Sequence, residues 1–168
     1  MSGRVLVLGS LNVDLVTRVE RHPRPGETVA GEGLQQLAGG KGVNQAVAAA
    51  AAGAPVAMVG CVGDDAGGAA YRRRLEALGV DVAGVRVCPG VPTGTAIVTV
   101  ADGGENSIVV IAGANDLLDE REVAAVDALG PGDVLLVQLE VPRAVVCTAV
   151  RRAAGRGARV VLNTAPYA

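Results

Sequence analysis

Short apolar runs alternate with stretches of helical periodicity along most of this chain. The runs lie at residues 5–8, 56–62, 134–139 and 159–163, and their pattern is typical of strands buried on both faces. Residues 43–52 predict a helix that ends at Gly53, and Tyr71, Leu75 and Leu78 predict the buried stripe of a second helix that ends at Gly79. Strands and helices in this order predict an α/β fold with a mostly parallel sheet.

Helix start signals support the same alternation. Asp119 and Glu122 have the spacing of a capping box, with Val123 and Val126 on the buried side, and Pro142 starts a later helix. Asp64 and Asp65 precede the second helix and are interpreted as its N-terminal cap rather than as a metal site.

Two segments interrupt the alternation. Residues 16–36 contain several prolines and glycines between short alternating pieces such as Glu27–Ala30, which predicts edge strands or a flap. Residues 95–100 and 107–111 predict two strands joined by the turn at 102–106. We expect these segments to pair as a small second sheet next to the main one.

Polar side chains follow the buried strands. Asn12 and Asp14 come after the first strand and Glu140 after a later one, while the glycine-rich turn at residues 37–46 places Lys41 and several backbone amides at a helix start. Because the carboxyl ends of parallel strands meet at one edge of a sheet, we expect a single cleft. Carboxylates, amides and turn N–H groups together suit a polyol. Alone, each residue also fits a turn or a cap, and the turn also fits a flexible loop with a solvated lysine.

Composition excludes several classes of function. The 168 residues fit one domain, half of them are hydrophobic, and the net charge is −2. No basic surface is evident and the only aromatic residues are two tyrosines, so we expect no nucleic acid partner. Three widely spaced cysteines predict reduced thiols and no metal site.

We expect a cytoplasmic protein without a membrane segment. Residues 42–63 carry no charge, but Gly53-Ala54-Pro55 interrupts them, and no apolar signal core precedes the first strand.

Three other motifs are ruled out. The glycine turn lacks the spacing of a Walker loop, residues 9–12 do not fit G-x-G-x-x-G, and His22 is the only histidine available for a catalytic triad.

Nine short motifs resemble the ribokinase-like (PfkB) carbohydrate kinases, in family order along the whole chain. They are Gly9-Ser-Leu-Asn-Val-Asp14, Pro25-Gly-Glu-Thr28, Gly39-Gly-Lys-Gly-Val-Asn-Gln-Ala46, Gly63-Asp-Asp65, Thr93-Gly94, Gly103-Gly-Glu-Asn106, Ala112-Gly-Ala-Asn115, Gln138-Leu-Glu140 and Asn163-Thr-Ala-Pro166.

The resemblance implies a three-layer α/β sandwich with a β lid, formed by segments at about 16–37 and 95–111. It also implies which residues bind the sugar substrate: Asn12, Val13, Asp14, Gly40, Lys41, Gly42, Val43, Asn44, Ile111 as an apolar wall, and Glu140. The lid of the family closes over the sugar and commonly forms a homodimer interface.

By resemblance, the intact enzyme transfers the γ-phosphate of ATP to ribose, using Mg²⁺ and a monovalent cation such as K⁺. Fructose, adenosine or pseudouridine are alternative substrates. The family's catalytic Asp segment and ATP site lie in a C-terminal half that nothing in residues 1–168 matches, so we expect no catalytic residue in this chain and no useful activity from it alone. We therefore expect a truncated kinase, with a noncatalytic sugar-binding module as the alternative.

Overall fold

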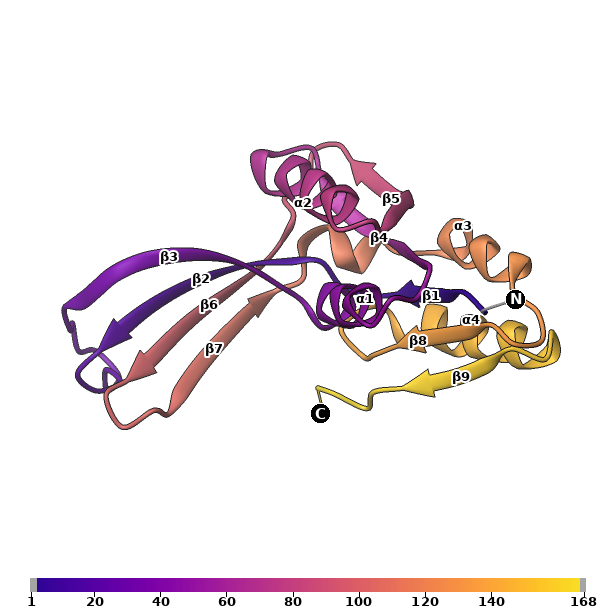
Figure 1. The fold of residues 1–168 in the computed structure, drawn as a ribbon. Coiled ribbons are helices and arrows are strands. Elements are labelled where there is room, and N and C mark those ends of the chain that lie inside the picture. Colours follow the sequence, from indigo (N-terminus) through magenta and orange to yellow (C-terminus); the bar gives the residue numbers. More distant parts are fainter. Residues whose placement is uncertain (1–2, 167–168) are drawn as a thin grey trace.

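The computed structural model describes residues 3–166, which form two sheets (Figure 1). The main sheet is entirely parallel and has the order β5-β4-β1-β8-β9. Its strands are β1 (Val5–Leu8), β4 (Val56–Gly63), β5 (Asp81–Cys88), β8 (Val134–Val137) and β9 (Arg159–Leu162). The predicted α/β fold with a mostly parallel sheet is confirmed.

Helices cover both faces of the main sheet and give three layers. On one face α1 (Lys41–Ala51) and α2 (Ala66–Ala77) bury an apolar cluster that includes Val7, Met58 and Leu75. On the other face α3 (Glu120–Val123), the 3₁₀ helix η2 (Ala124–Ala128) and α4 (Arg143–Gly155) pack on Leu8 and Leu135. Residues that alternate along a strand point to opposite faces, so the same apolar runs fill both clusters.

The second sheet extends away from this body, as Figure 1 shows. It has the order β3-β2-β6-β7 and consists of β2 (Asn12–Val19), β3 (Gly31–Gly39), β6 (Gly94–Ala101) and β7 (Asn106–Ile111). Its first strand begins at Asn12, four residues before the segment expected from the prolines and glycines. The candidate site residues Asn12 and Asp14 are therefore part of this sheet.

Two sequence-based predictions need correction, and one strand was not predicted. Glu27–Ala30 is not a strand, because Glu27 instead binds the Arg21 guanidinium and the Arg24 backbone amide in a turn. Leu78 is 46% exposed, because α2 ends at Ala77 and the chain turns before Leu78 reaches the core. The strand β5 was not predicted, because only part of its alternating residues is buried.

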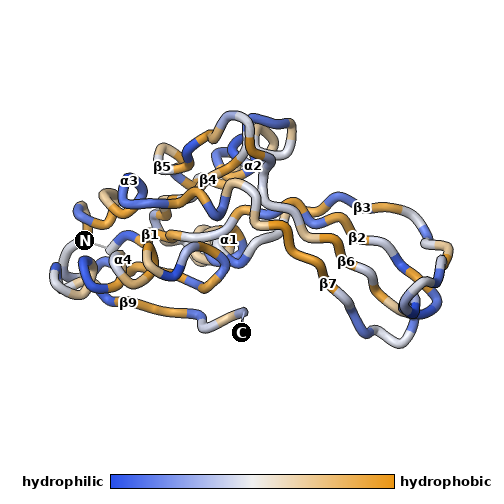
Figure 2. The backbone as a smooth tube through the Cα atoms, turned by 180° about the vertical axis from the view of Figure 1, so that it is seen from behind, coloured by the Kyte–Doolittle hydropathy of each residue, from blue (hydrophilic) through white to orange (hydrophobic). Residues whose placement is uncertain are grey.

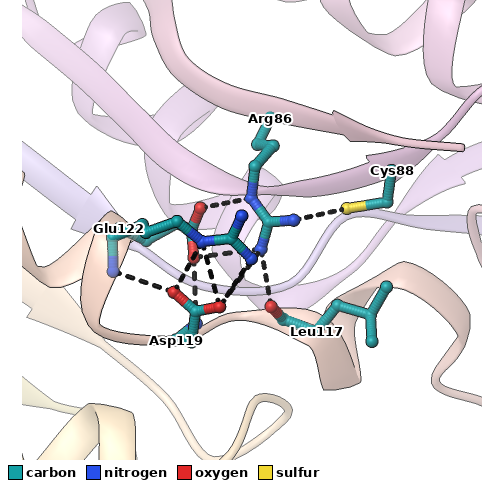
Figure 3. Close-up of polar contacts among 6 residues, drawn as sticks. Arg86, Cys88, Leu117, Asp119 and Glu122 are labelled. Atoms are coloured by element: carbon teal, nitrogen blue, oxygen red, sulfur yellow. Dashed lines mark hydrogen bonds and ion pairs between the residues drawn. The ribbon is translucent and has the colours of Figure 1, made fainter.

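An ionic cluster connects β5 to the helical layer that contains α3 (Figure 3). Arg86 Nε donates to Glu122 Oε1 at 2.6 Å, and Arg86 Nη2 donates to the Leu117 carbonyl at 2.6 Å. The predicted capping box is present, since Asp119 accepts from the Arg121 amide and Glu122 bonds back to the Asp119 amide. Glu122 therefore both starts α3 and neutralises Arg86.

Candidate functional site

The N-terminus of α1 is closed by groups of the chain itself. The Lys41 amide donates to Glu140 Oε2 at 2.9 Å, the Gly42 amide to Ser10 Oγ at 3.2 Å, and the Val43 amide to the Ser10 carbonyl at 3.1 Å. The Ser10 hydroxyl donates to the same Glu140 oxygen at 2.6 Å. These amides would otherwise lack partners at a helix start, so Ser10 and Glu140 together act as a cap formed by residues distant in sequence.

The glycine turn is therefore not a free anion site. Lys41 Nζ lies 3.4 Å from Glu140 Oε1, so the charge that the turn attracts is the carboxylate of Glu140. Two glycines permit this close packing. Gly40 has φ of 93°, and a Cβ on Gly42 would lie 2.6 Å from the Ser10 nitrogen.

Asn12 and Asp14 enter the same region from β2. Both lie on one face of the second sheet because they are two residues apart on a strand. The carboxylate of Asp14 lies against the backbone of Gly39, where a Cβ would come within 2.0 Å of Asp14 Oδ2. Burial, and next the negative charge of Glu140, raise the pKa of Asp14 above its ordinary value of 3.8, while Lys41 partly opposes this.

One cavity of about 410 Å³ joins these residues. Six of the ten predicted sugar-binding residues line it: Asn12, Asp14, Gly40, Lys41, Asn44 and Glu140. The other four do not. Val13 packs on the opposite face of the second sheet, Gly42 and Val43 are buried in α1, and Ile111 points away.

The second sheet supplies the apolar wall of this cavity. Its lining residues are Ala96, Val98, Ile108 and Val110. The register pairs Ala96 with Val110, so these residues share a face, whereas Ile111 pairs with Thr95 on the other face. The wall predicted at Ile111 is thus formed by its neighbour Val110. Pro166 closes part of the rim.

A smaller cavity of about 280 Å³ lies on the opposite face of β2 and β3. Arg74 is its only charged lining residue, and Val13, Ala38 and Tyr71 are among the others. Since it offers no carboxylate to accept bonds from hydroxyls, it is a poorer match to a polyol than the larger cavity.

Sequence reasoning assigned no role in the site to three buried residues whose hydrogen bonds connect its parts, namely Ser10, Tyr71 and Asn115. The Tyr71 hydroxyl accepts from the Gly39 amide at 2.5 Å and contacts the Asn12 carbonyl. It therefore links the first residue of β2 and the last residue of β3 to α2. Burial raises the pKa of Tyr71 to about 12. Ser10 and Asn115 lie within motifs of the family resemblance, which was the available signal, whereas Tyr71 could only be assigned to the core.

Within residues 3–166, no group of three or more His, Cys, Asp or Glu side chains is placed to hold a metal ion. No helix in that range is long and apolar enough to cross a membrane.

The pfkB family of carbohydrate kinases matches residues 2–167, and the chain belongs to this family. Within the family its relatives include ribokinases. It is 42% identical to the ribokinase of Haemophilus influenzae over 99% of this chain and 55% of that protein.

Solved structures show the same relationship. The ribokinase of Cryptococcus neoformans var. grubii serotype A in complex with ADP has a TM-score of 0.89 at 37% identity, covering 99% of this chain and 52% of that one. The Arabidopsis thaliana ribokinase complexed with ribose and ATP has a TM-score of 0.85 at 32% identity, covering 99% and 55%. The chain thus spans about half the length of the relatives it matches.

Proposed function

We propose that the protein of which these residues form the sugar-binding half transfers the γ-phosphate of ATP to a hydroxyl of ribose. The observation that carries the proposal is the shared cavity, in which Asn12 and Asp14 of β2 meet Glu140, which follows β8. The similarity to ribokinases supports ribose over fructose, adenosine or pseudouridine.

The lining chemistry suits a sugar. Asp14 and Glu140 accept hydrogen bonds, while Lys41 donates and the amides of Asn12 and Asn44 can do either. A buried partner left unpaired is costly, so such a set rejects analogues that lack a hydroxyl. The apolar residues of β6 and β7 line the opposite side of the cavity, which supports the role of the second sheet as a lid that excludes water when it closes.

ATP, Mg²⁺ and K⁺ belong to this proposal as requirements of the intact enzyme. By the family resemblance their sites lie in the C-terminal half, and the amides at the start of α1 are bonded to Ser10 and Glu140 within this chain. We therefore assign no catalytic residue within this chain and derive no step of phosphate transfer from it.

A homodimer through the second sheet is also part of the proposal. All six residues of the edge strand β7 are exposed, and four consecutive ones, Ile108–Ile111, are apolar (Figure 2). An apolar edge strand favours pairing or aggregation, so a second copy of the protein is the partner that we propose.

The dimer can be tested by sedimentation of a charged variant. Val109→Lys is expected to shift a dimer toward monomer at micromolar concentration. Leu78→Lys makes the same chemical change at a residue that is also exposed but lies outside the second sheet, and it should leave the assembly unchanged. Dissociation by both variants, or by neither, contradicts the proposed interface.

A cytoplasmic location is proposed because ATP is available there. The free cysteines Cys61, Cys88 and Cys147 are compatible with a reducing compartment.

The proposed activity is tested by assaying phosphate transfer from ATP to ribose, fructose, adenosine and pseudouridine, together with calorimetric binding of each. Transfer to ribose at the highest kcat/KM supports the proposal, and preference for another acceptor corrects the substrate. Sugar binding without ATP turnover identifies a noncatalytic module instead. Asp14→Ala should abolish ribose binding while leaving the fold largely intact, and unchanged ribose affinity would refute its assignment.

A further inference from the structure

Asn115 lies beneath the sugar cavity without lining it. It belongs to the 3₁₀ helix η1 (Gly113–Leu117), it is 1% exposed, and it contacts the start of β2 more than 100 residues away in sequence. Its neighbour Asn12 is 3% exposed and does line the cavity. In a hydrogen bond between two buried side-chain amides, one must supply its NH₂ group and the other its carbonyl oxygen.

The backbone of Leu11 determines the orientation of Asn115. The Leu11 amide donates to Asn115 Oδ1 at 3.0 Å, and Asn115 Nδ2 donates to the Leu11 carbonyl at 3.3 Å. A backbone amide can only donate and a backbone carbonyl can only accept, so the reverse orientation of the Asn115 side chain would oppose both contacts. The NH₂ group of Asn115 therefore faces Asn12.

Asn115 in turn determines the orientation of Asn12. Asn115 Nδ2 donates to Asn12 Oδ1 at 2.7 Å, which engages the carbonyl of the Asn12 side chain away from the sugar. No hydrogen bond among residues 3–166 uses Asn12 Nδ2. Gly94 leaves the space in which the two amides meet, since a Cβ there would lie 2.2 Å from Asn115 Nδ2 and 2.3 Å from Asn12 Oδ1.

We propose that Asn115 is a positioning residue that makes Asn12 a hydrogen-bond donor only toward the substrate. This inference rests on the proposed function, because it specifies how the same cavity recognises the hydroxyl groups of a sugar. Asn12 then requires an oxygen that accepts, whereas the ionised Asp14 on the same face requires a hydroxyl that donates. Asn12 and Asp14 together therefore select a sugar in which one oxygen accepts a hydrogen bond and another hydroxyl donates one.

Deoxyfluoro sugars test this polarity, because fluorine can accept weakly but cannot donate. Calorimetry with ribose, deoxyribose and deoxyfluororibose analogues, modified at each hydroxyl-bearing carbon in turn, compares the two replacements. At the carbon whose substituent faces Asn12 Nδ2, the full-length protein should bind the fluoro analogue about twofold to threefold more tightly than the deoxy analogue, which is the low end of what one neutral hydrogen bond contributes because fluorine is a weak acceptor.

Variants at the two amides should change the preference in different ways, by reversing it at Asn12 and by removing it at Asn115. Asn12→Asp keeps the bond from Asn115 but presents an acceptor to the sugar, so the deoxy analogue should bind more tightly than the fluoro analogue. Asn115→Leu frees the Asn12 amide to turn, so the preference between the two analogues should disappear. A loss of stability alone would weaken all sugars equally.

Thr93→Val is the matched control. Thr93 is 2% exposed and bonds to the Gly63 amide and to Asp65, so the variant also loses buried hydrogen bonds next to Gly94 without touching either asparagine. It should lose stability and keep the preference for fluorine. Retention of that preference in Asn115→Leu, or its loss in Thr93→Val, would overturn the assignment.

A measurement without sugar separates this inference from the proposed function. In labelled, ligand-free protein, NMR should detect a coupling across the hydrogen bond from Asn115 Nδ2 to the side-chain carbonyl carbon of Asn12. A coupling from Asn12 Nδ2 to the Asn115 carbonyl contradicts the inference even if ribose binds. If no sugar binds, the proposed function fails and the NMR coupling still decides the orientation.

Discussion

Replacing Gly42 by alanine tests the packing that forms the proposed sugar site. The added Cβ would lie 2.6 Å from the Ser10 nitrogen and 2.7 Å from the Ser10 oxygen, and both atoms belong to the backbone. Close-packed backbone cannot absorb such an overlap, so α1 must move by roughly 0.8 Å, the difference between 2.6 Å and the 3.4 Å of ordinary contact.

This movement affects the three hydrogen bonds at the start of α1. The Gly42 amide is already 3.2 Å from Ser10 Oγ, so the added distance breaks that bond, and the bonds of the Lys41 and Val43 amides weaken with it. Neutral bonds contribute about 1 kcal/mol each and a bond to a carboxylate about 2 kcal/mol. Alanine is more favourable than glycine in a helix by about 1 kcal/mol, so the net loss in the free energy of unfolding is about 2–3 kcal/mol.

Urea unfolding of the full-length protein measures this loss, and titration calorimetry measures ribose affinity. Because Lys41 and Asn44 move with α1, affinity for ribose should fall by about tenfold, which corresponds to roughly one lost hydrogen bond. Gly155→Ala is the matched control. Gly155 also lies in a helix but has open space around its Cβ position, so the variant should gain up to about 1 kcal/mol and bind ribose normally. Equal stability gains in both variants would refute the packing argument.

Three further predictions concern single groups. The raised pKa of Asp14 means that its ionised form is disfavoured in the folded protein, so its contribution to stability declines as pH rises from 3.8 through that pKa. Ribose affinity should increase over the same pH window, because the carboxylate accepts a hydrogen bond from a sugar hydroxyl. A midpoint of ribose affinity below pH 3.8 in calorimetry contradicts this prediction. Arg86→Met should cost about 3 kcal/mol in urea unfolding, because it leaves the buried Glu122 carboxylate unpaired, and a loss below about 1 kcal/mol would show that the cluster contributes little. Tyr71→Phe preserves the buried ring but leaves the Gly39 amide without its partner; we expect a loss of about 1–3 kcal/mol together with weaker ribose binding, and normal affinity would separate Tyr71 from the site.

The sequence alone determined most of the main sheet and the general position of the site. Apolar runs such as Val5–Leu8 predict strands because burial on both faces leaves no alternation, and the glycines before α1 predict a tight turn at a helix start. Asn12, Asp14 and Glu140 were predicted to meet because the carboxyl ends of parallel strands share one edge.

Tertiary structure alone decided what each polar group does. The amides after Gly40 bind Ser10 and Glu140 rather than a free anion, and Asn115 orients Asn12, through partners that lie about 30 to 130 residues apart. A local pattern records the periodicity of burial along one element. It does not record the register between elements that places Val110 rather than Ile111 in the cavity, since hydrogen-bond partners and facing directions are properties of the assembled sheets.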